Sequence, residues 1–327
     1  MKFVVTGGAG FIGSHVALRL ASQGNDVVVY DNLYSGKLGN VDQIRAELPE
    51  GVGSLEFFEA DILDPDALTA ALEGSTAVFH QAAVASVPRS FADPAASLRA
   101  NVEGTVRVLE CCRAAGMKTV VLASSSSLYG DTPTLPKHEG MPRRPMSPYA
   151  LSKAVDEQLL EMWTATYGMR TVGLRYFNIF GPRQDPNSEY AAVVPRFITR
   201  MLAGQSPTIY GDGKQSRDFT FVDNAVAANL LAAGLDPSTG QVIDQPREPG
   251  FVALNIGIGE RYTLLDLVAM LNEILGTVIE PVFEPVRVGD VRHSQAAIDA
   301  AREHLGYEPE VSFRAGLERT VEWFATR

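Results

Sequence analysis

Short apolar runs alternate with helix-like periodicity over the first half of the chain. Six runs are apolar at successive positions and rich in β-branched residues, which is typical of strands buried on both faces of a parallel sheet. Between these runs, apolar residues recur at the spacing of one helix face. The predicted strands are residues 3–6, 26–30, 55–60, 77–80, 119–123 and 171–176, and the predicted helices are 13–23, 66–72 and 101–115. This alternation predicts an α/β fold built on a doubly wound parallel sheet.

The pattern changes after residue 176. The segments 177–195 and 210–224 are rich in glycine, proline, aspartate and asparagine and are typical of loops. Apolar periodicity then predicts helices near 194–203, from about 224 and over 264–275, with one further strand in 253–259. We therefore predict a first domain over residues 1–177, which the chain revisits within 219–256, and a smaller C-terminal α/β lobe over 178–327.

Composition and charge narrow the classes of partner. Hydrophobic residues make up 46% and charged residues 20% of the 327 residues, as in ordinary soluble proteins. The formal net charge of -11 argues against nucleic acid and anionic membranes, so an anionic substrate needs a local pocket of arginines. The adjacent Cys111 and Cys112 fit neither a disulfide framework nor a metal site. No apolar run is long enough for a membrane span or a signal peptide, so we expect a cytoplasmic protein.

A glycine-rich turn joins the first predicted strand to the first predicted helix. Gly7, Gly10 and Gly13 are spaced by three, and glycines at such a turn let the backbone approach a pyrophosphate at a helix N-terminus. This spacing differs from the common G-x-G-x-x-G fingerprint, so the position between strand and helix carries the interpretation. Asp31 ends the second strand, where a carboxylate can bind both ribose hydroxyls and repel a 2′-phosphate, which favours NAD over NADP. Two alternatives stay open: Asp31 as a turn residue that caps the next segment, and Asp61 as an adenine acceptor or a helix N-cap.

A tyrosine and a lysine stand four residues apart in the segment SPYALSK, residues 147–153. On a helix this spacing puts Tyr149 and Lys153 on one face, one turn apart. A phenol beside an ammonium ion loses its proton more readily, as a general base must. The same spacing also occurs by chance on many surface helices, so alone it does not establish a catalytic pair.

Five motifs occur in order along the chain: TGGAGFIGSH (6–15), HQAA (80–83), SSSSLYGD (124–131), SPYALSK (147–153) and LRYFN (174–178). Together they resemble the extended short-chain dehydrogenase/reductase family with its Rossmann-like cofactor domain, and within it the NAD-dependent nucleotide-sugar epimerases. The segments SVPRS (86–90), GPRQDPNSEYAAVVP (181–195) and GDGKQSRDF (211–219) are similar to those of UDP-N-acetylglucosamine 4-epimerases. The resemblance implies an isomerase that lends a hydride from C4 of a UDP-sugar to NAD and returns it to the opposite face. It also implies a homodimer that forms through the helices 101–115 and 148–167.

The resemblance also assigns the catalytic roles. It implies that Tyr149 is the base that removes the proton of the C4 hydroxyl, and that Ser125 bridges O4 and Tyr149. Lys153 is then the residue that binds the nicotinamide ribose and favours the tyrosinate. No metal is implied. The implied NAD contacts are Gly7, Gly10, Phe11, Ile12, Gly13, Asp31, Asn32, Asp61, Ile62, Gln81, Ala82, Ala83, Tyr149, Lys153 and Tyr176.

For the substrate, the resemblance implies that Arg217 and Arg287 clamp the UDP diphosphate, which suits the geometry and charge of arginine. In the family, a side chain near the C-terminal GDV motif bounds the pocket beside the C2 substituent of the sugar. That position falls on Ser294, and a serine leaves room for an N-acetyl group. The implied substrate contacts are Ala85, Ser86, Ser126, Ser127, Asn178, Gln184, Ala192, Val193, Arg217, Arg287, Asp290 and Ser294.

Alternative functions stay open. One is a UDP-glucose 4-epimerase proper. Another is a UDP-glucuronate 4-epimerase or decarboxylase, which Asp185 disfavours because relatives that act on glucuronate have an arginine in that region. Dehydration is disfavoured, because Ser126 and Ser127 stand where the related dehydratases carry an acidic pair. A remote alternative is a non-catalytic NAD-sensing protein.

Overall fold

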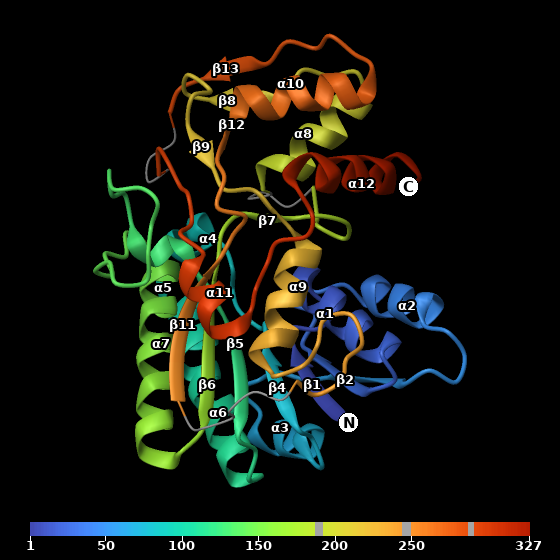
Figure 1. Ribbon diagram of the computed structural model, residues 1–327, viewed down its shortest axis with the longest axis vertical. Coiled ribbons are helices and arrows are strands. Elements are labelled where there is room, and N and C mark those ends of the chain that lie inside the picture. The colour runs from blue at the N-terminus through green and yellow to red at the C-terminus, as the bar shows by residue number, and fades with distance from the viewer. Residues whose placement is uncertain (187–191, 244–249, 287–290) are drawn as a thin grey trace.

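A parallel sheet forms the centre of the molecule (Figure 1). The computed structural model describes residues 1–186, 192–243, 250–286 and 291–327. The strands of the sheet are β1 (Lys2–Thr6), β2 (Asp26–Asp31), β3 (Ser54–Glu59), β4 (Ala77–His80), β5 (Thr119–Ser125), β6 (Arg170–Tyr176) and β11 (Gly250–Ile256). They lie in the order β11-β6-β5-β4-β1-β2-β3, and every neighbouring pair is parallel. From β1 the strands are added in one direction as far as β3, and from β4 they are added in the opposite direction, so the strand order reverses between β1 and β4. The predicted doubly wound α/β fold is therefore confirmed.

Helices cover both faces of the sheet (Figure 1). One face packs against α1 (Phe11–Ser22), α2 (Leu38–Glu47) and α9 (Val222–Ala232), and the other against α3 (Pro65–Leu72), α6 (Gly104–Ala114) and α7 (Pro148–Tyr167). Successive side chains of a strand point to opposite faces. In β1, Phe3 and Val5 pack in the core beneath α1, whereas Val4 packs with α3, α6 and α7. This burial on both faces explains why the strands read as continuous apolar runs.

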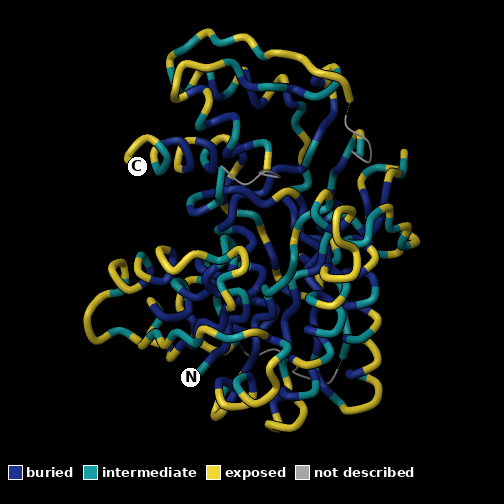
Figure 2. Tube along the Cα trace, turned by 180° about the vertical axis from the view of Figure 1, so that it is seen from behind, coloured by how far each residue is buried: buried dark blue, intermediate teal, exposed yellow. Residues whose placement is uncertain are grey.

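A smaller lobe lies above the carboxyl edge of the sheet, at the top of Figure 1. Its elements are α8 (Val193–Leu202), α10 (Leu264–Leu275), α12 (Phe313–Ala325), β8 (Thr208–Tyr210) paired with β13 (Val282–Glu284), and β9 (Ser216–Arg217) paired with β12 (Tyr262–Thr263). The rings of Phe219 and Phe313 stack with centroids 5.0 Å apart, and Phe180 meets Phe313 edge to face. Figure 2 shows the buried trace running through the sheet, while the outer edge of the lobe is largely exposed.

The chain returns to the sheet after it has entered the lobe. Helix α9 packs beside α1, and β11 adds an outer strand next to β6. Both elements fall within the predicted return over 219–256. The domain boundary at residue 177 stays a prediction.

The predicted helix over 101–115 has a different start in the structure. Residues Arg99–Glu103 form a π-helical turn, and α6 begins only at Gly104. The Asn101 side chain accepts a hydrogen bond from the Val84 amide at 2.7 Å and donates to the Ser152 hydroxyl at 2.9 Å. A π turn of this kind often marks a functional site. Here it turns an asparagine toward the carboxyl edge of the sheet.

Several short elements escaped prediction. Helix α2 buries only Asn40, Val41 and Ile44, which is too few apolar residues for a clear periodic signal. The other helices that escaped prediction are the short α4 (Val87–Ala92), α5 (Pro94–Leu98) and α11 (Asp299–Leu305) and the longer α12. Among the described residues, no helix combines the length and the apolar character needed to cross a lipid bilayer.

Candidate active site

A cavity of about 480 Å³ opens at the carboxyl edge of the sheet, beside the ends of β1, β2 and β4. Ligands of doubly wound sheets bind at this edge, where the strand order reverses. Every residue predicted to contact the cofactor lines this cavity. The sequence interpretation missed other lining residues, among them Tyr34, Ser35, Ala96 and Ala100. They come from loops and short helices whose placement no local pattern reports.

The glycine-rich turn forms the floor of this cavity. Gly7 has a φ of +68°, and a Cβ there would lie 2.6 Å from the Ala82 amide nitrogen. A Cβ on Gly13 would collide with the Gly7 carbonyl oxygen. Only glycine fits either position, and no side chain caps the first turn of α1 behind Gly10. The free amides of this helix N-terminus suit the pyrophosphate of a dinucleotide.

Asp31 ends β2 and lies in the wall of the same cavity, 7% exposed. One carboxylate oxygen accepts a hydrogen bond from the Ala9 amide at 3.0 Å, and the other accepts from Leu33 at 2.8 Å. Burial raises the pKa of Asp31, and these two amides oppose the rise. Asp31 therefore caps its own turn, as one alternative predicted. Its contact with a ribose stays a prediction.

Asp61 also lines the cavity, and it is not a helix N-cap. Its carboxylate accepts from the Leu63 amide at 2.9 Å and from the Asn32 side chain at 2.8 Å. The N-cap of α3 is Asp64, which accepts from the amides of Asp66 and Ala67. The N-cap alternative for Asp61 is therefore wrong.

The segment SPYALSK contains the start of α7, a helix of 20 residues that packs against β5 and β6. The Ser147 hydroxyl caps the helix by accepting from the Ala150 amide at 3.1 Å, and Pro148 takes the first helical position. Tyr149 then lies in the first turn, and Lys153 follows one turn later on the same face. Serine and proline thus fix where the helix starts and which way the tyrosine faces.

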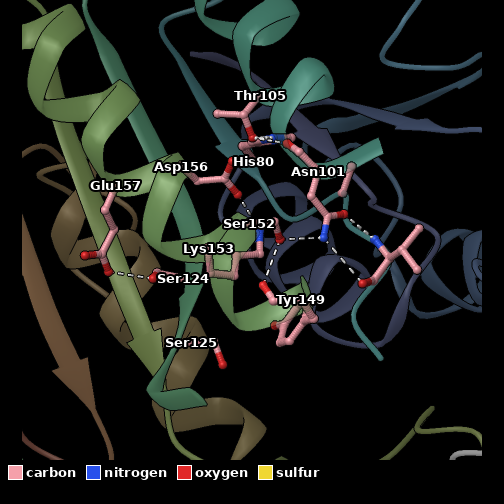
Figure 3. Close-up of polar contacts among 12 residues, drawn as sticks. His80, Asn101, Thr105, Ser124, Ser125, Tyr149, Ser152, Lys153, Asp156 and Glu157 are labelled. Carbon is pink, nitrogen blue, oxygen red and sulfur yellow. Dashed lines mark hydrogen bonds and ion pairs between the residues drawn. The ribbon is translucent and has the colours of Figure 1, made fainter. Parts of the chain in front are cut away.

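Lys153 is buried together with an acidic partner (Figure 3). Its ammonium lies 3.1 Å from a carboxylate oxygen of Asp156, and the two side chains are 2% and 0% exposed. His80 lies close by, with hydrogen bonds to Thr6 at 2.7 Å and Thr105 at 3.1 Å. Burial, and then the charge of Lys153, lower the pKa of His80 to about 3. His80 is therefore neutral, and Asp156 supplies the countercharge for Lys153.

Ser125 ends β5 and begins the short 3-10 helix Ser126–Tyr129. Its hydroxyl oxygen lies 2.9 Å from the hydroxyl of Ser127, and it also accepts from the Ser127 amide at 3.2 Å. Ser125 and Tyr149 both line a second cavity of about 410 Å³ next to the first. In the part of the chain that the structure describes, no direct hydrogen bond joins these two side chains. The cavity that both residues line offers room for a bridging group.

A buried ion pair stands behind the serine run. The Glu157 carboxylate accepts two hydrogen bonds from the guanidinium of Arg175, each at 2.8 Å, and one from the Ser124 hydroxyl at 2.6 Å. Arg143 approaches the same carboxylate at 3.0 Å. Because Ser124 precedes Ser125 in β5, this ion pair holds the strand end that carries the candidate catalytic hydroxyl.

Two asparagines organise the site, and the sequence interpretation missed both. Asn229 of α9 donates to the Tyr176 hydroxyl at 2.7 Å and accepts from Gln81 at 2.9 Å, and Tyr176 in turn donates to Gln81 at 3.2 Å. Asn101 holds Ser152, whose hydroxyl donates to the Tyr149 carbonyl at 2.8 Å. A buried asparagine inside a helix is the only signal that the sequence offers for either residue.

The second cavity is lined by several of the predicted substrate residues. Tyr149 and Tyr176 line both the first and the second cavity, so the two cavities meet at these tyrosines. A third cavity of about 230 Å³ continues from the second, and Asn178 and Arg217 line both of these. The predicted residues in the second cavity are Ser126, Ser127, Asn178, Arg217 and Ser294, and those in the third include Ala192 and Val193.

Other predicted substrate residues lie elsewhere. Ala85 lines the first cavity rather than the second. Ser86 caps α4 by accepting from the Arg89 amide at 3.3 Å, and Gln184 donates to the Ile179 carbonyl at 3.3 Å. Asp185 forms an ion pair with Lys37 at 2.8 Å, across the loop before α2. Arg287 and Asp290 lie outside the described residues.

The three connected cavities can hold an extended ligand pair. A glycine cradle and a carboxylate at the end of β2 suit a dinucleotide in the first cavity. Serine hydroxyls and a tyrosine in the second suit proton transfer to a hydroxylated ligand, and Arg217 at the entrance to the third suits a phosphate. Among the described residues, no cluster of side chains has the composition of a metal site.

Comparisons with known proteins agree with this arrangement. The sequence matches the model of the NAD dependent epimerase/dehydratase family over residues 3–243. A UDP-glucose 4-epimerase of Mycolicibacterium smegmatis is 39% identical over 100% of this chain and 99% of its own length. A UDP-N-acetylglucosamine 4-epimerase from Methanobrevibacter ruminantium, solved in complex with UDP-N-acetylmuramic acid, superimposes with a TM-score of 0.89 at 38% identity and covers 99% of this chain and 98% of its own. A UDP-glucose 4-epimerase of Thermotoga maritima, solved with UDP-glucose, gives a TM-score of 0.89 at 38% identity over 100% of this chain and 99% of its own. This chain therefore belongs to the NAD dependent epimerase/dehydratase family.

Proposed function

We propose that this NAD-dependent enzyme is a UDP-sugar 4-epimerase whose preferred pair is UDP-N-acetylglucosamine and UDP-N-acetylgalactosamine. UDP-glucose and UDP-galactose are its further substrates. The observation that carries the proposal is that Tyr149 lines both the first cavity, with its glycine-rich turn, and the second cavity, with its serine hydroxyls. A base at such a junction can act on a carbon that faces a cofactor.

Each candidate catalytic residue has one task in this proposal. Tyr149 takes the proton of the C4 hydroxyl and later returns it, and Ser125, which lines the same cavity, bridges O4 and the phenol. Lys153 favours the ionised phenol by its charge and binds the nicotinamide ribose. NAD, when bound, supplies the hydride acceptor and donor at C4. The transient 4-keto sugar presents its other face because the diphosphate link stays anchored while the sugar turns.

The diphosphate anchor rests on Arg217 and Asn178. Both side chains line the second and the third cavity, where the charged link of a UDP-sugar would pass from sugar to uridine. Ala192 and Val193 line the third cavity and would face the uridine. Arg287, the second proposed clamp, falls outside the described residues.

The choice of sugar rests on Ser294. This serine is 5% exposed in the wall of the second cavity, where the backbone amide donates to the Ser216 carbonyl at 3.0 Å. A small side chain at a fixed position leaves room for a substituent at C2. Room alone does not exclude a plain hexose, so UDP-glucose remains a substrate in this proposal.

Acid sugars stay a second candidate because of Asp185. The ammonium of Lys37 forms an ion pair with the Asp185 carboxylate and so partly neutralises the negative charge that was expected to repel a glucuronate. Asp185 is therefore expected to repel a glucuronate less than an unpaired carboxylate would. Dehydration stays disfavoured, since Ser126 and Ser127 supply hydroxyls and no carboxylate at the cavity wall.

A substrate panel tests the proposal. The purified protein, loaded with NAD, would receive UDP-N-acetylglucosamine, UDP-glucose or UDP-glucuronate, and NMR would resolve the products. We expect the C4 epimer of each accepted sugar, with the highest kcat/KM for UDP-N-acetylglucosamine. Tyr149→Phe should abolish turnover while NAD stays bound. Near wild-type turnover in Tyr149→Phe would contradict the assignment of the base, and a higher kcat/KM for UDP-glucose would contradict the preference.

A homodimer through α6 and α7 completes the proposal. Helix α7 exposes large apolar side chains at Leu151, Met162 and Tyr167, each more than 40% exposed. A second copy of the chain would cover them. Light scattering of the purified protein should give twice the mass of one chain, and Met162→Glu should shift the population toward monomer.

A further inference from the structure

A lysine that the catalytic proposal does not use lies in the wall of the sugar-side cavity. Lys137 is 1% exposed and lines the second cavity with Ser126, Ser127 and Ser294. Its backbone amide donates to the Gln295 carbonyl at 2.8 Å, and its carbonyl accepts from the Ala297 amide at 2.8 Å. These bonds fix Lys137 beside the segment that carries Ser294.

The ammonium of Lys137 is only partly compensated. It donates to the Gly130 carbonyl at 3.0 Å and lies 5.9 Å from the centroid of the Tyr129 ring. In the described part of the chain, no carboxylate comes within ion-pair distance of it. An ammonium ion has several N–H donors, so one carbonyl acceptor leaves donors over. Burial of a cation without an anionic partner is costly, and such groups often belong to a binding site.

Lys137 keeps its proton at neutral pH although its surroundings lower its pKa. Burial lowers the pKa of Lys137 to about 8, and the positive charge of Arg217 contributes to the fall. The exposed Asp131 acts in the opposite direction. The wall of the cavity therefore includes a positively charged residue together with Ser126, Ser127 and Ser294. Little solvent reaches this charge, so it is weakly screened.

This positive wall distinguishes between sugars. A hydroxyl both donates and accepts hydrogen bonds, whereas a carbonyl or carboxylate oxygen only accepts. A desolvated cation favours the acceptor, and most strongly one with a negative charge. A plain hexose brings only hydroxyls and its ring oxygen to the wall. An acetamido or uronate group adds the acceptor that the wall lacks.

We propose that Lys137 is a specificity-determining residue of the sugar site, whose positive charge favours UDP-sugars that carry an added carbonyl or carboxylate oxygen. This inference rests on the proposed function in one respect, namely that the sugar of a UDP-sugar occupies the second cavity. It adds to the role of Ser294, because Ser294 provides room for the substituent and Lys137 provides the charge that favours it.

Binding measurements on the NAD-loaded enzyme test the inference without relying on turnover. Isothermal titration calorimetry would give Kd for UDP, UDP-glucose, UDP-N-acetylglucosamine and UDP-glucuronate. Lys137→Met removes the charge at similar length, Lys137→Gln removes it while keeping a donor for Gly130, and Lys137→Arg keeps it. Lys118→Met, at an exposed site away from the cavities, serves as the matched control.

Wild-type enzyme should bind at least one of the two substituted sugars more tightly than UDP-glucose. In Lys137→Met and Lys137→Gln, Kd for the favoured sugar should rise roughly ten- to a hundredfold, the range of a hydrogen bond to a charged group. Kd for UDP and UDP-glucose should change less than about threefold. A larger effect on UDP-glucuronate identifies the carboxylate as the favoured acceptor, and a larger effect on UDP-N-acetylglucosamine identifies the acetamido carbonyl.

Equal losses for all the sugars would make Lys137 a purely structural residue and overturn the inference. Equal wild-type affinities for the three sugars would overturn it without any variant, even if Lys137→Met failed to fold. Failure of the proposed function gives a different result: the sugars bind with the expected order, but NMR detects no C4 epimer.

Discussion

The ammonium of Lys153 and the carboxylate of Asp156 form a buried ion pair at 3.1 Å, one helical turn apart on α7. Burial raises the pKa of Asp156, and the charge of Lys153 opposes the rise. Among the described residues, Asp156 is the only carboxylate within ion-pair distance of Lys153. Asp156 therefore belongs to the candidate active site as the countercharge of Lys153.

Asp156→Asn should destabilise the protein and lower turnover. Asparagine keeps an acceptor for Lys153 but removes the countercharge, and breaking a buried pair on one side costs about 3 to 5 kcal/mol of the free energy of unfolding. Chemical denaturation would measure this loss, and we expect kcat/KM to fall in the same variant. Glu161→Gln, which removes an exposed carboxylate of the same helix, is the control. A variant as stable and as active as the wild type would show that Lys153 does not need Asp156 as its countercharge.

Local signals in the sequence brought together the residues that line the first cavity, whereas residues that act across the fold escaped prediction. Gly7, Gly13 and Asp31 belong to one strand-turn-helix-strand segment, so their positions in predicted elements place them at one edge of the sheet. Asn229 contacts Gln81 across 148 positions, and nothing near either residue indicates the other. Lys137 pairs with Ala296, in the segment after Ser294, and no local pattern in the sequence indicates that pairing. Only the folded chain shows which polar side chains are buried together.

Ser294→Tyr should change sugar preference. A tyrosine ring in the wall of the second cavity fills the space expected for a C2 substituent. We expect kcat/KM for UDP-N-acetylglucosamine to fall at least tenfold more than for UDP-glucose, a difference of about 1.4 kcal/mol. Ser294→Ala, which keeps the space, should leave the ratio near the wild-type value. Equal losses on both sugars would remove Ser294 from the specificity argument.

Glu157→Ala should destabilise the protein strongly. The substitution leaves the guanidinium of Arg175 buried without its carboxylate, and breaking a buried pair on one side costs about 3 to 5 kcal/mol of the free energy of unfolding. Chemical denaturation would measure this loss. Arg143→Gln should cost less than about 1 kcal/mol, because Arg143 is partly exposed and Glu157 keeps Arg175. A small loss in Glu157→Ala would show that water or another group replaces the carboxylate.

Asp218 should link the stability of the small lobe to pH. It is 0% exposed, and its carboxylate accepts hydrogen bonds from the amides of Ile258, Gly259 and Ala296 and from the Thr220 hydroxyl. Burial raises the pKa of Asp218 from 3.8 to about 6, and these donors oppose the rise.

Because the folded chain binds this proton more tightly than the unfolded chain, the stabilisation is fully present below about pH 4 and is lost as pH rises through about 6. Two pKa units correspond to about 3 kcal/mol, which is the upper limit of the effect. Asp218→Asn has no such proton, so the difference in free energy of unfolding between wild type and this variant isolates the effect. We expect that difference to shrink by about 2 to 3 kcal/mol between pH 4 and pH 8. If it grew instead, the backbone amides would outweigh burial, and Asp218 would be ionised throughout this range.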